Sequence, residues 1–232
     1  MRTGKDTNKY SITLAFSGAM NEACAEMSLL IVVYSLSIDC CIDVGDLSFG
    51  EVSPKREIVM KVVLHICCGV CASSVAERLM SEGHEVIGFF CNPNIHPVNE
   101  YKRRLESADK VARLLRFPLV EDPCDPEEWL LQARPFESEP EGGKRCELCF
   151  HFRLERTYRY LVESGWNVFT TTLTCSPHKS AEVVNRVGQD IGGDKFLMMD
   201  FKKANGFNRS IQMAKQWKLY RQKYCGCTYS MR

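Results

Sequence analysis

From Met60 to the end of the chain, stretches with the pattern of buried strands alternate with stretches of helical periodicity, and this alternation limits the possible folds more than any other feature. Residues 62–66 form a continuous apolar run, which is typical of parallel strands that are covered on both faces. Residues 99–116 instead carry apolar side chains three and four positions apart, as an amphipathic helix does. The alternation predicts a single-domain α/β fold with a parallel sheet and helices on both faces.

The remaining elements follow from the same patterns, with glycines and a proline as boundary signals. Gly83 and Gly165 end helical stretches, and Pro126 precedes acidic residues at a helix start. Strands are expected at residues 62–66, 85–90, 117–120, 167–174 and 195–199. Helices are expected at residues 71–82, 99–116, from 126 onward, 149–164, 180–191 and 206–220.

Residues 1–59 differ from the rest, because they combine polar residues, three cysteines and a short apolar run without a clear helical or strand period. We expect the α/β domain to comprise residues 60–232. Residues 1–59 are then a poorly ordered N-terminal extension, either an upstream continuation of the reading frame outside the functional protein or a genuine appendage. The intact mass of the natively expressed protein distinguishes the two.

The chain contains 13 cysteines among 232 residues, a content that would suit a secreted protein held together by disulfides. However, the number of cysteines is odd, and the chain is long enough to bury a hydrophobic core without disulfides. In addition, no clean signal peptide begins the sequence. The apolar run at 27–38 is too short to span a bilayer and lacks an Ala-x-Ala-like cleavage site. We therefore expect a cytoplasmic protein with reduced thiols and no membrane association.

Two separated cysteine pairs, Cys67-Cys68 and Cys146-x-x-Cys149, are the strongest chemical signal. Thiolates are soft ligands that favour iron–sulfur clusters, zinc and copper(I), and two pairs that meet in space could supply the four thiolates of a [4Fe–4S] cluster. Zinc bound by the same thiolates is the alternative. Adjacent cysteines suit one tetrahedral zinc ion poorly, whereas a cluster has separate iron corners, so the spacing favours iron–sulfur.

Cys67, Cys68 and Cys71 follow the first strand and begin the next helix, at the sheet edge where α/β proteins bind ligands. Packing of small cysteines in the core is the ordinary alternative. Cys225-Gly226-Cys227 is a candidate redox pair, because the glycine lets the sulfurs approach, although a loose tail is the alternative. The remaining cysteines form no further motif and are expected to be structural or incidental; they are Cys24, Cys40, Cys41, Cys91, Cys124 and Cys175.

Polar side chains follow several predicted strands at the same edge; they are Asn92, Asn94, His96, His178, Lys179 and Asp200. Prolines make the loop around His96 rigid, and loops at this edge commonly carry sites. Asp200 could ligate a metal or transfer protons. A plain loop histidine and a capping or surface aspartate are the ordinary alternatives.

The helix expected at 99–116 opens with Tyr101, Lys102, Arg103 and Arg104. A tyrosine that stacks on a base beside cations that bind phosphates is one interpretation. A solvated helix face is the more usual one. The formal net charge of +1 does not by itself indicate a nucleic-acid-binding protein, although a local basic face can exist on a nearly neutral molecule.

From Met60 onward the chain resembles the cobalamin-independent epoxyqueuosine reductase family of the QueH type. Five motifs carry the resemblance in order, and residues 1–59 lie outside it. The motifs are His65-Ile66-Cys67-Cys68-Gly69-Val70-Cys71, Asn92-Pro93-Asn94-Ile95-His96-Pro97 with Glu100-Tyr101, Arg145-Cys146-Glu147-Leu148-Cys149, Ser176-Pro177-His178-Lys179 and Tyr220-Arg221-Gln222-Lys223-Tyr224-Cys225-Gly226-Cys227.

The resemblance implies a nucleotide-hydrolase-like fold of the HUP class and an oxidoreductase that performs the last step of queuosine synthesis. The substrate would be epoxyqueuosine in the anticodon loop of tRNA, reduced with electrons from an external donor. The implied ligands of a [4Fe–4S] cluster are Cys67, Cys68, Cys146 and Cys149. The implied redox-active disulfide joins Cys225 and Cys227. The family is also thought to hold an additional iron ion, for which Cys71 and Asp200 are candidate ligands.

The remaining roles are hypotheses for this chain. The candidate proton donors are His96, His178 and Asp200. The candidate substrate-binding residues are Asn92, Asn94, Tyr101, Arg103, Arg104 and Lys179, with Lys102, Lys202 and Lys203 as further phosphate contacts. Two other functions stay open: an ATP-dependent tRNA-thiolating enzyme of the same fold and a zinc-binding RNA module. Residues 67–74 argue against the former, because they contain one glycine and no Walker lysine.

Overall fold

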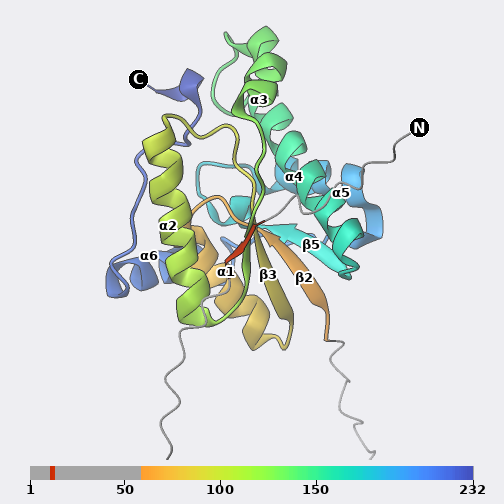
Figure 1. Ribbon diagram of the computed structural model, residues 1–232, viewed down its shortest axis with the longest axis vertical. Helices are drawn as coiled ribbons and strands as arrows, with labels where there is room; N and C mark the ends of the chain where they lie inside the picture. The colour runs from red at the N-terminus through yellow and green to blue at the C-terminus, as the bar shows by residue number, and fades with distance from the viewer. Residues whose placement is uncertain (1–10, 14–58, 232) are drawn as a thin grey trace, which may run out of the picture. The chain divides into compact units, whose positions relative to one another are not determined.

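The computed structural model of the chain describes residues 11–13 and 59–231 (Figure 1). These residues belong to one compact unit. The apolar run at 27–38 and almost all of the expected extension at 1–59 lie outside the described residues. Within residues 11–13 and 59–231, no helix is both long and apolar enough to cross a membrane.

The sheet is built around β2 (Lys61–His65), which is flanked by β3 (Glu85–Phe90) and β5 (Val168–Thr171), both parallel to it. β4 (Leu119–Glu121) runs parallel to β3, and β1 (Ser11–Thr13) pairs antiparallel with β4 at the edge. The strand order is therefore β1-β4-β3-β2-β5. The parallel strands β2 to β5 confirm the predicted α/β class, whereas no sequence pattern predicts β1.

Helices lie on both sides of the sheet, as predicted (Figure 1). One group comprises α1 (Gly69–Ser81), α2 (Val98–Leu115) and α6 (Gly206–Gln216), which pack around α1. The other group is centred on α4 and comprises α3 (Pro126–Ala133), α4 (Lys144–Ser164) and α5 (Ala181–Gly192). Right-handed crossovers between parallel strands place these groups on opposite faces. The HUP class itself stays a prediction.

The predicted strand at 195–199 is wrong. Only an isolated parallel bridge forms there, between Phe169 and Phe196. The Leu197 N–H donates to the Phe169 carbonyl at 2.9 Å, but the Leu197 carbonyl accepts from the side-chain hydroxyl of Thr170, also at 2.9 Å. The Thr170 hydroxyl thus occupies the Leu197 carbonyl, which would accept a backbone N–H if the strand pairing continued. The pairing stops after the one bridge. The last part of the strand expected at 167–174 likewise becomes a 3₁₀ helix, Thr172–Cys175.

The central strand carries the core, because Val62, Val63 and Leu64 are fully buried. Burying each such side chain contributes about 1.5–3 kcal/mol. His65 ends the strand and is also fully buried, with Nδ1 2.8 Å from Thr171 Oγ1 and Nε2 3.2 Å from the Cys91 carbonyl oxygen. Burial lowers the pKa of His65 to about 3, so the ring stays neutral. It fixes β2 to β5 and to the segment after β3.

Gly69 lets the start of α1 approach α2 closely. A Cβ atom at this position would lie 2.4 Å from the Ser107 carbonyl oxygen, so no larger residue fits without a shift of the backbone. This contact holds the first turn of α1 next to α2 and fixes the position of the cysteines around it.

Candidate metal and redox site

A cavity of about 490 Å³ is lined by six cysteines from three distant parts of the chain. Two come from the corner between β2 and α1, two from the first turns of α4 and two from the C-terminal segment. The cysteines are Cys67, Cys71, Cys146, Cys149, Cys225 and Cys227. Cys67 of the first pair, both cysteines of the second pair and the candidate redox pair therefore share one cavity.

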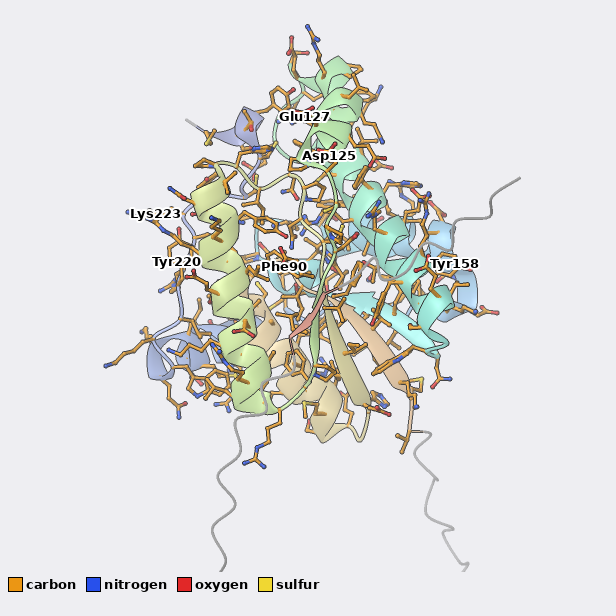
Figure 2. The ribbon with its side chains drawn as sticks, in the orientation of Figure 1. Phe90, Asp125, Glu127, Tyr158, Tyr220 and Lys223 are labelled. Carbon is orange, nitrogen blue, oxygen red and sulfur yellow. The ribbon has the colours of Figure 1, made fainter. Side chains whose placement is uncertain are left out.

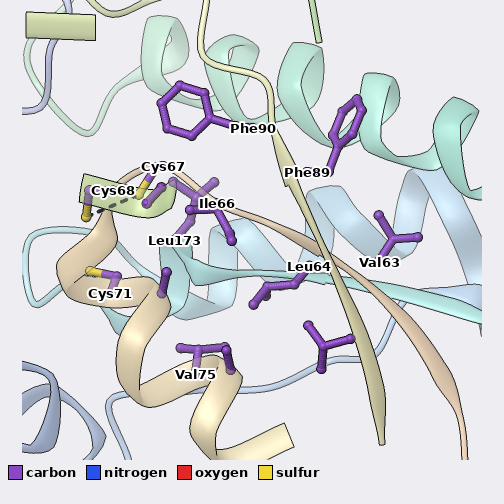
Figure 3. Close-up of a cluster of buried hydrophobic side chains, with 14 of the residues drawn as sticks. Val63, Leu64, Ile66, Cys67, Cys68, Cys71, Val75, Phe89, Phe90 and Leu173 are labelled. Carbon is purple, nitrogen blue, oxygen red and sulfur yellow. Dashed lines mark hydrogen bonds between the residues drawn. The ribbon is translucent and has the colours of Figure 1, made fainter. Parts of the chain in front are cut away.

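The corner between β2 and α1 holds three cysteines (Figure 3). Cys68 is the N-cap residue of α1, and its Sγ lies 4.0 Å from Cys67 Sγ. Cys67 is fixed by its backbone N–H, which donates to Thr172 Oγ1 at 3.2 Å. Cys68 is 1% exposed and, unlike Cys67 and Cys71, does not line the cavity.

The first turns of α4 present the second pair. The helix begins at Lys144, five residues before the predicted start, so Cys146 and Cys149 lie one turn apart on one helix face. The Gly142 N–H donates to Cys146 Sγ at 3.2 Å. Arg145 is buried and donates from Nη1 to three carbonyl groups of the preceding loop, those of Phe136, Glu137 and Glu139. It therefore holds the loop in front of the pair.

Arg153 is not singled out by the sequence patterns and is a buried cation in contact with one of these thiols. It lies one turn after Cys149, is 3% exposed, and its Nη1 is 3.9 Å from Cys149 Sγ. Its Nη2 donates to Asn92 Oδ1 at 2.5 Å. Burial lowers the pKa of Arg153, but Cys149 and Cys67 raise it by more. Its i, i+4 spacing from Cys149 is the signal that could have identified it.

The thiols at the corner and in α4 differ in acidity. Hydrogen bonds from Cys68 and Cys71 hold the pKa of Cys67 well below its usual value, with help from the charges of Lys179 and Arg153. The hydrogen bond that Cys68 gives to Cys67 raises the pKa of Cys68 to about 12. Burial raises the pKa of Cys149. Cys67 is therefore the thiol at this corner that ionises first.

The C-terminal segment is packed, which argues against a loose tail. The His96 N–H donates to the Gly226 carbonyl at 2.8 Å, and Arg104 donates to the Cys225 carbonyl, also at 2.8 Å. Gly226 has a φ of 101°, and a Cβ there would lie 2.9 Å from Ile95 Cγ1. Glycine therefore meets both a conformational and a steric requirement between the two cysteines.

The two C-terminal thiols have opposite pKa shifts. The Cys227 thiol donates to Cys225, and this bond lowers the pKa of Cys225 to about 5 against the opposing effect of burial. The same bond raises the pKa of Cys227. The Cys227 N–H also lies 3.4 Å from Cys225 Sγ. One member of the pair is thus disposed to be a thiolate and the other a thiol, which is the arrangement that thiol–disulfide chemistry uses.

Four of the polar residues singled out from the sequence line the cavity; they are Asn94, Arg104, His178 and Lys179. Asn94 is 3% exposed and its Oδ1 has no hydrogen-bond partner within the described part of the chain, so it is available to a ligand. His178 is exposed at the cavity wall.

The other predicted polar residues do not line the cavity; they are Asn92, His96, Tyr101, Lys102, Arg103, Asp200, Lys202 and Lys203. Asn92 is fully buried and donates to the Ile66 carbonyl at 2.9 Å, a structural position behind Arg153. Tyr101 donates to Glu121 Oε1 at 2.7 Å. Asp200 accepts from the Lys202 N–H at 3.1 Å and pairs with its ammonium at 3.3 Å, as an aspartate at the start of a turn does.

His96 and Arg103 also face other parts of the protein. The His96 ring is tilted against Trp129, with ring centroids 6.3 Å apart, and burial lowers its pKa. The Arg103 guanidinium lies over the Tyr220 ring, 5.8 Å from its centroid. Tyr220 and Lys223 mark the segment that runs beside α2 (Figure 2). Cys175, expected to be incidental, lies 3.8 Å from Ser74 Oγ in α1, and a hydrogen bond from Cys71 lowers its pKa.

Comparisons with known proteins agree on one family. A family model described as epoxyqueuosine reductase QueH matches residues 62–232. The epoxyqueuosine reductase QueH of Streptococcus pyogenes is 38% identical over 192 residues, which cover 78% of this chain and 74% of that protein. Proteins of the same name from Acinetobacter baylyi and Thermotoga maritima are 36% and 34% identical over 74% and 73% of this chain, and over 81% and 90% of their own lengths.

Proposed function

Since this chain belongs to the epoxyqueuosine reductase QueH family, whose members named above are oxidoreductases, we propose that it reduces epoxyqueuosine in tRNA to queuosine. The observation that carries the proposal is the cavity lined by Cys67, by both cysteines of the α4 pair and by the C-terminal dithiol. A reductive deoxygenation needs a source of two electrons beside the bound substrate, and this cavity supplies the residues for one.

The residues fit a [4Fe–4S] cluster by the chemistry of their donors. Cys67, Cys146 and Cys149 line the cavity, and Cys68 Sγ lies 4.0 Å from Cys67 Sγ. We propose these four thiolates as the ligands, two from each stretch, as such a cluster requires. Arg153 supplies a buried positive charge against their negative charge. When bound, the cluster would supply one-electron transfer and a Lewis-acidic iron.

The overall step balances with the C-terminal dithiol as reductant. The epoxide loses both carbon–oxygen bonds and its oxygen leaves as water, which consumes two electrons and two protons. Oxidation of Cys225 and Cys227 to a disulfide releases two electrons and two protons. An external dithiol or electron-transfer protein then reduces the disulfide before the next turnover. The low pKa of Cys225 supports its role as the reactive thiolate.

The other cavity residues are proposed to bind the anticodon loop and transfer protons. An unpaired base can be turned out of a tRNA loop into a protein cavity, where polar side chains contact its edges. Asn94 presents its unpartnered Oδ1 for such a contact. Lys179, Arg221 and Lys223 line the cavity and are positioned to bind phosphates. His178 is the proposed proton donor, because it is the imidazole at the cavity wall.

The test is anaerobic turnover of tRNA that carries epoxyqueuosine, with the modified nucleoside identified by mass spectrometry after digestion. The parent chain should convert the nucleoside to its deoxygenated form over several turnovers with an external reductant. Cys67→Ala and Cys225→Ser should each lose at least about 10²-fold in rate, because each removes a group without which the electron path is incomplete.

Cys175→Ser is the matched control, because Cys175 is buried but does not line the cavity, and serine can keep its hydrogen bond with Cys71. It should retain turnover within about threefold. Unchanged turnover in Cys225→Ser would contradict the role of the dithiol. Absence of conversion by the parent chain after reconstitution with iron and sulfide would contradict the proposed function.

A further inference from the structure

A second group of metal-ligating side chains lies outside the cavity. Cys91 follows β3 directly, and Asp122 and Cys124 follow β4, the neighbouring parallel strand. The two strands therefore deliver the three residues to the same edge of the sheet. One ligand atom from each residue lies within 4.8 Å of the other two. None of these three residues lines the cavity, so the group is separate from the proposed reductase site.

The separation of the two sulfurs suits a shared ion. Cys91 Sγ lies 3.6 Å from Cys124 Sγ. Two thiolates bound to one tetrahedral zinc ion at about 2.3 Å each lie about 3.8 Å apart. A disulfide needs a sulfur separation of about 2.05 Å. The observed separation is thus close to what a zinc ion imposes and needs little movement of either side chain.

Burial and charge indicate what the group requires. Cys91 and Asp122 are 0% and 1% exposed. Arg156 donates to both oxygens of Asp122, from Nε and Nη2, at 2.7 Å each. As metal ligands, two thiolates and one carboxylate would carry three negative charges, of which Arg156 balances one. A divalent cation would balance the other two, so it can replace the two thiol protons without leaving an uncompensated charge in the buried group.

We propose that Cys91, Asp122 and Cys124 bind a zinc ion, with the fourth position left to a water molecule that enters past the half-buried Cys124. Two sulfurs and one carboxylate oxygen form a ligand set that zinc accepts, whereas copper(I) prefers sulfur alone and magnesium prefers oxygen alone. The inference does not depend on the proposed reductase activity.

The site would connect the ends of two neighbouring strands behind the cavity. Asn92 follows Cys91 and holds Arg153 through its Oδ1 at 2.5 Å. A metal ion between Cys91 and Cys124 would therefore fix the backbone that supports Arg153. The ligands of this site follow β3 and β4, whereas the cysteines of the cavity come from the corner, α4 and the C-terminal segment. The two sites therefore share no ligand.

The test is anomalous diffraction from crystals of the full chain, purified anaerobically with one equivalent of zinc, at wavelengths on both sides of the zinc absorption edge. The proposal predicts an anomalous peak at bonding distance from Cys91 and Cys124 Sγ that disappears below the zinc edge. Three results would overturn the proposal. They are a peak that remains below the zinc edge, as iron would give, no peak at all, or a Cys91–Cys124 disulfide in these crystals.

Metal analysis of variants in solution supplies the second readout. Cys124→Ala should lower the zinc content from about one ion per chain to below about a tenth, while the iron content stays that of the parent. Cys124 is half-buried, so its replacement should not unfold the chain as loss of a core residue could. Cys175→Ser is the control that should keep the zinc. Equal zinc in Cys124→Ala and the parent would contradict the site, whatever the result of the turnover assay.

Discussion

Arg104 Nη1 donates to the carbonyl oxygen of Cys225 at 2.8 Å, so a residue near the start of α2 holds the C-terminal dithiol in place. Its Nη2 donates to the Tyr224 carbonyl at 2.9 Å, and its Nε pairs with Glu100 at 2.8 Å. Arg104 is 2% exposed. All three of these donors contact other groups of the protein, which gives Arg104 a positioning role, and its predicted contact with substrate phosphates stays a prediction.

Arg104→Ala should therefore release the C-terminal segment and destabilise the chain. The substitution leaves the Glu100 carboxylate without its buried partner, which typically costs about 3–5 kcal/mol of unfolding free energy. Hydrogen exchange at residues 224–227 should become faster than in the parent chain. Arg103→Ala is the matched control, because the neighbouring side chain is exposed, and its effect should stay within about 0.5 kcal/mol. Equal exchange in the two variants would contradict the positioning role.

Arg153 and Asn92 should be energetically coupled, because Asn92 Oδ1 and the guanidinium are both buried and meet at 2.5 Å. Arg153→Met leaves this oxygen without a donor, an effect of about 1–3 kcal/mol. A double-mutant cycle with Asn92→Leu, measured by denaturant unfolding, should give a coupling free energy above about 0.5 kcal/mol. Additive effects would show that the two residues act independently.

Alkylation of Cys225 should depend on pH as expected for a thiol of low pKa. Its pKa is lowered to about 5 by the hydrogen bond from Cys227, so the reactive thiolate is present above this pH and is lost below it. In the reduced chain, the alkylation rate at Cys225, followed by peptide mass spectrometry, should change little from pH 8 to pH 6. An ordinary thiol with a pKa of about 8.5 would instead slow about tenfold per pH unit.

Cys227→Ala tests the cause of this shift. Without the thiol donor, the pKa of Cys225 should rise, and the rate profile should move to higher pH. An unchanged profile in this variant would assign the low pKa to some other group, such as the nearby Ser230 hydroxyl.

His178→Ala and Asp200→Asn should affect turnover very differently. His178 lines the cavity, whereas Asp200 interacts with Lys202 away from it. Loss of a proton donor typically lowers the rate by about 10²-fold or more, so His178→Ala should show a fall of this size in anaerobic turnover. Asp200→Asn should stay within about twofold. The reverse order would transfer the proton-donor role to Asp200.

Local patterns in the sequence were sufficient for most of the fold. The apolar run of β2 and the periodicity of α2 predicted their elements to within a few residues. The segment at 195–199 was not predictable in this way, because a hydroxyl of Thr170 ends the pairing that its apolar residues favour. β1 depends on pairing with β4, which is distant in the sequence.

The candidate site was predictable where its chemistry is local and not where it depends on distant contacts. The cysteine pairs are visible as short motifs, and the structure brings all of their members except Cys68 to the wall of one cavity. Arg104 looks like part of a basic helix surface, and only the folded C-terminal segment shows its partners. Cys91 and Cys124 look incidental, because their proximity arises only when β3 and β4 end side by side.

The most direct test of the account is the iron and acid-labile sulfide content of the anaerobically purified chain, compared with Cys146→Ser. The account predicts about four iron atoms and four sulfides per chain in the parent, and loss of most of both in Cys146→Ser. A parent chain that binds zinc but neither iron nor sulfide at the cavity, even after reconstitution, would contradict it.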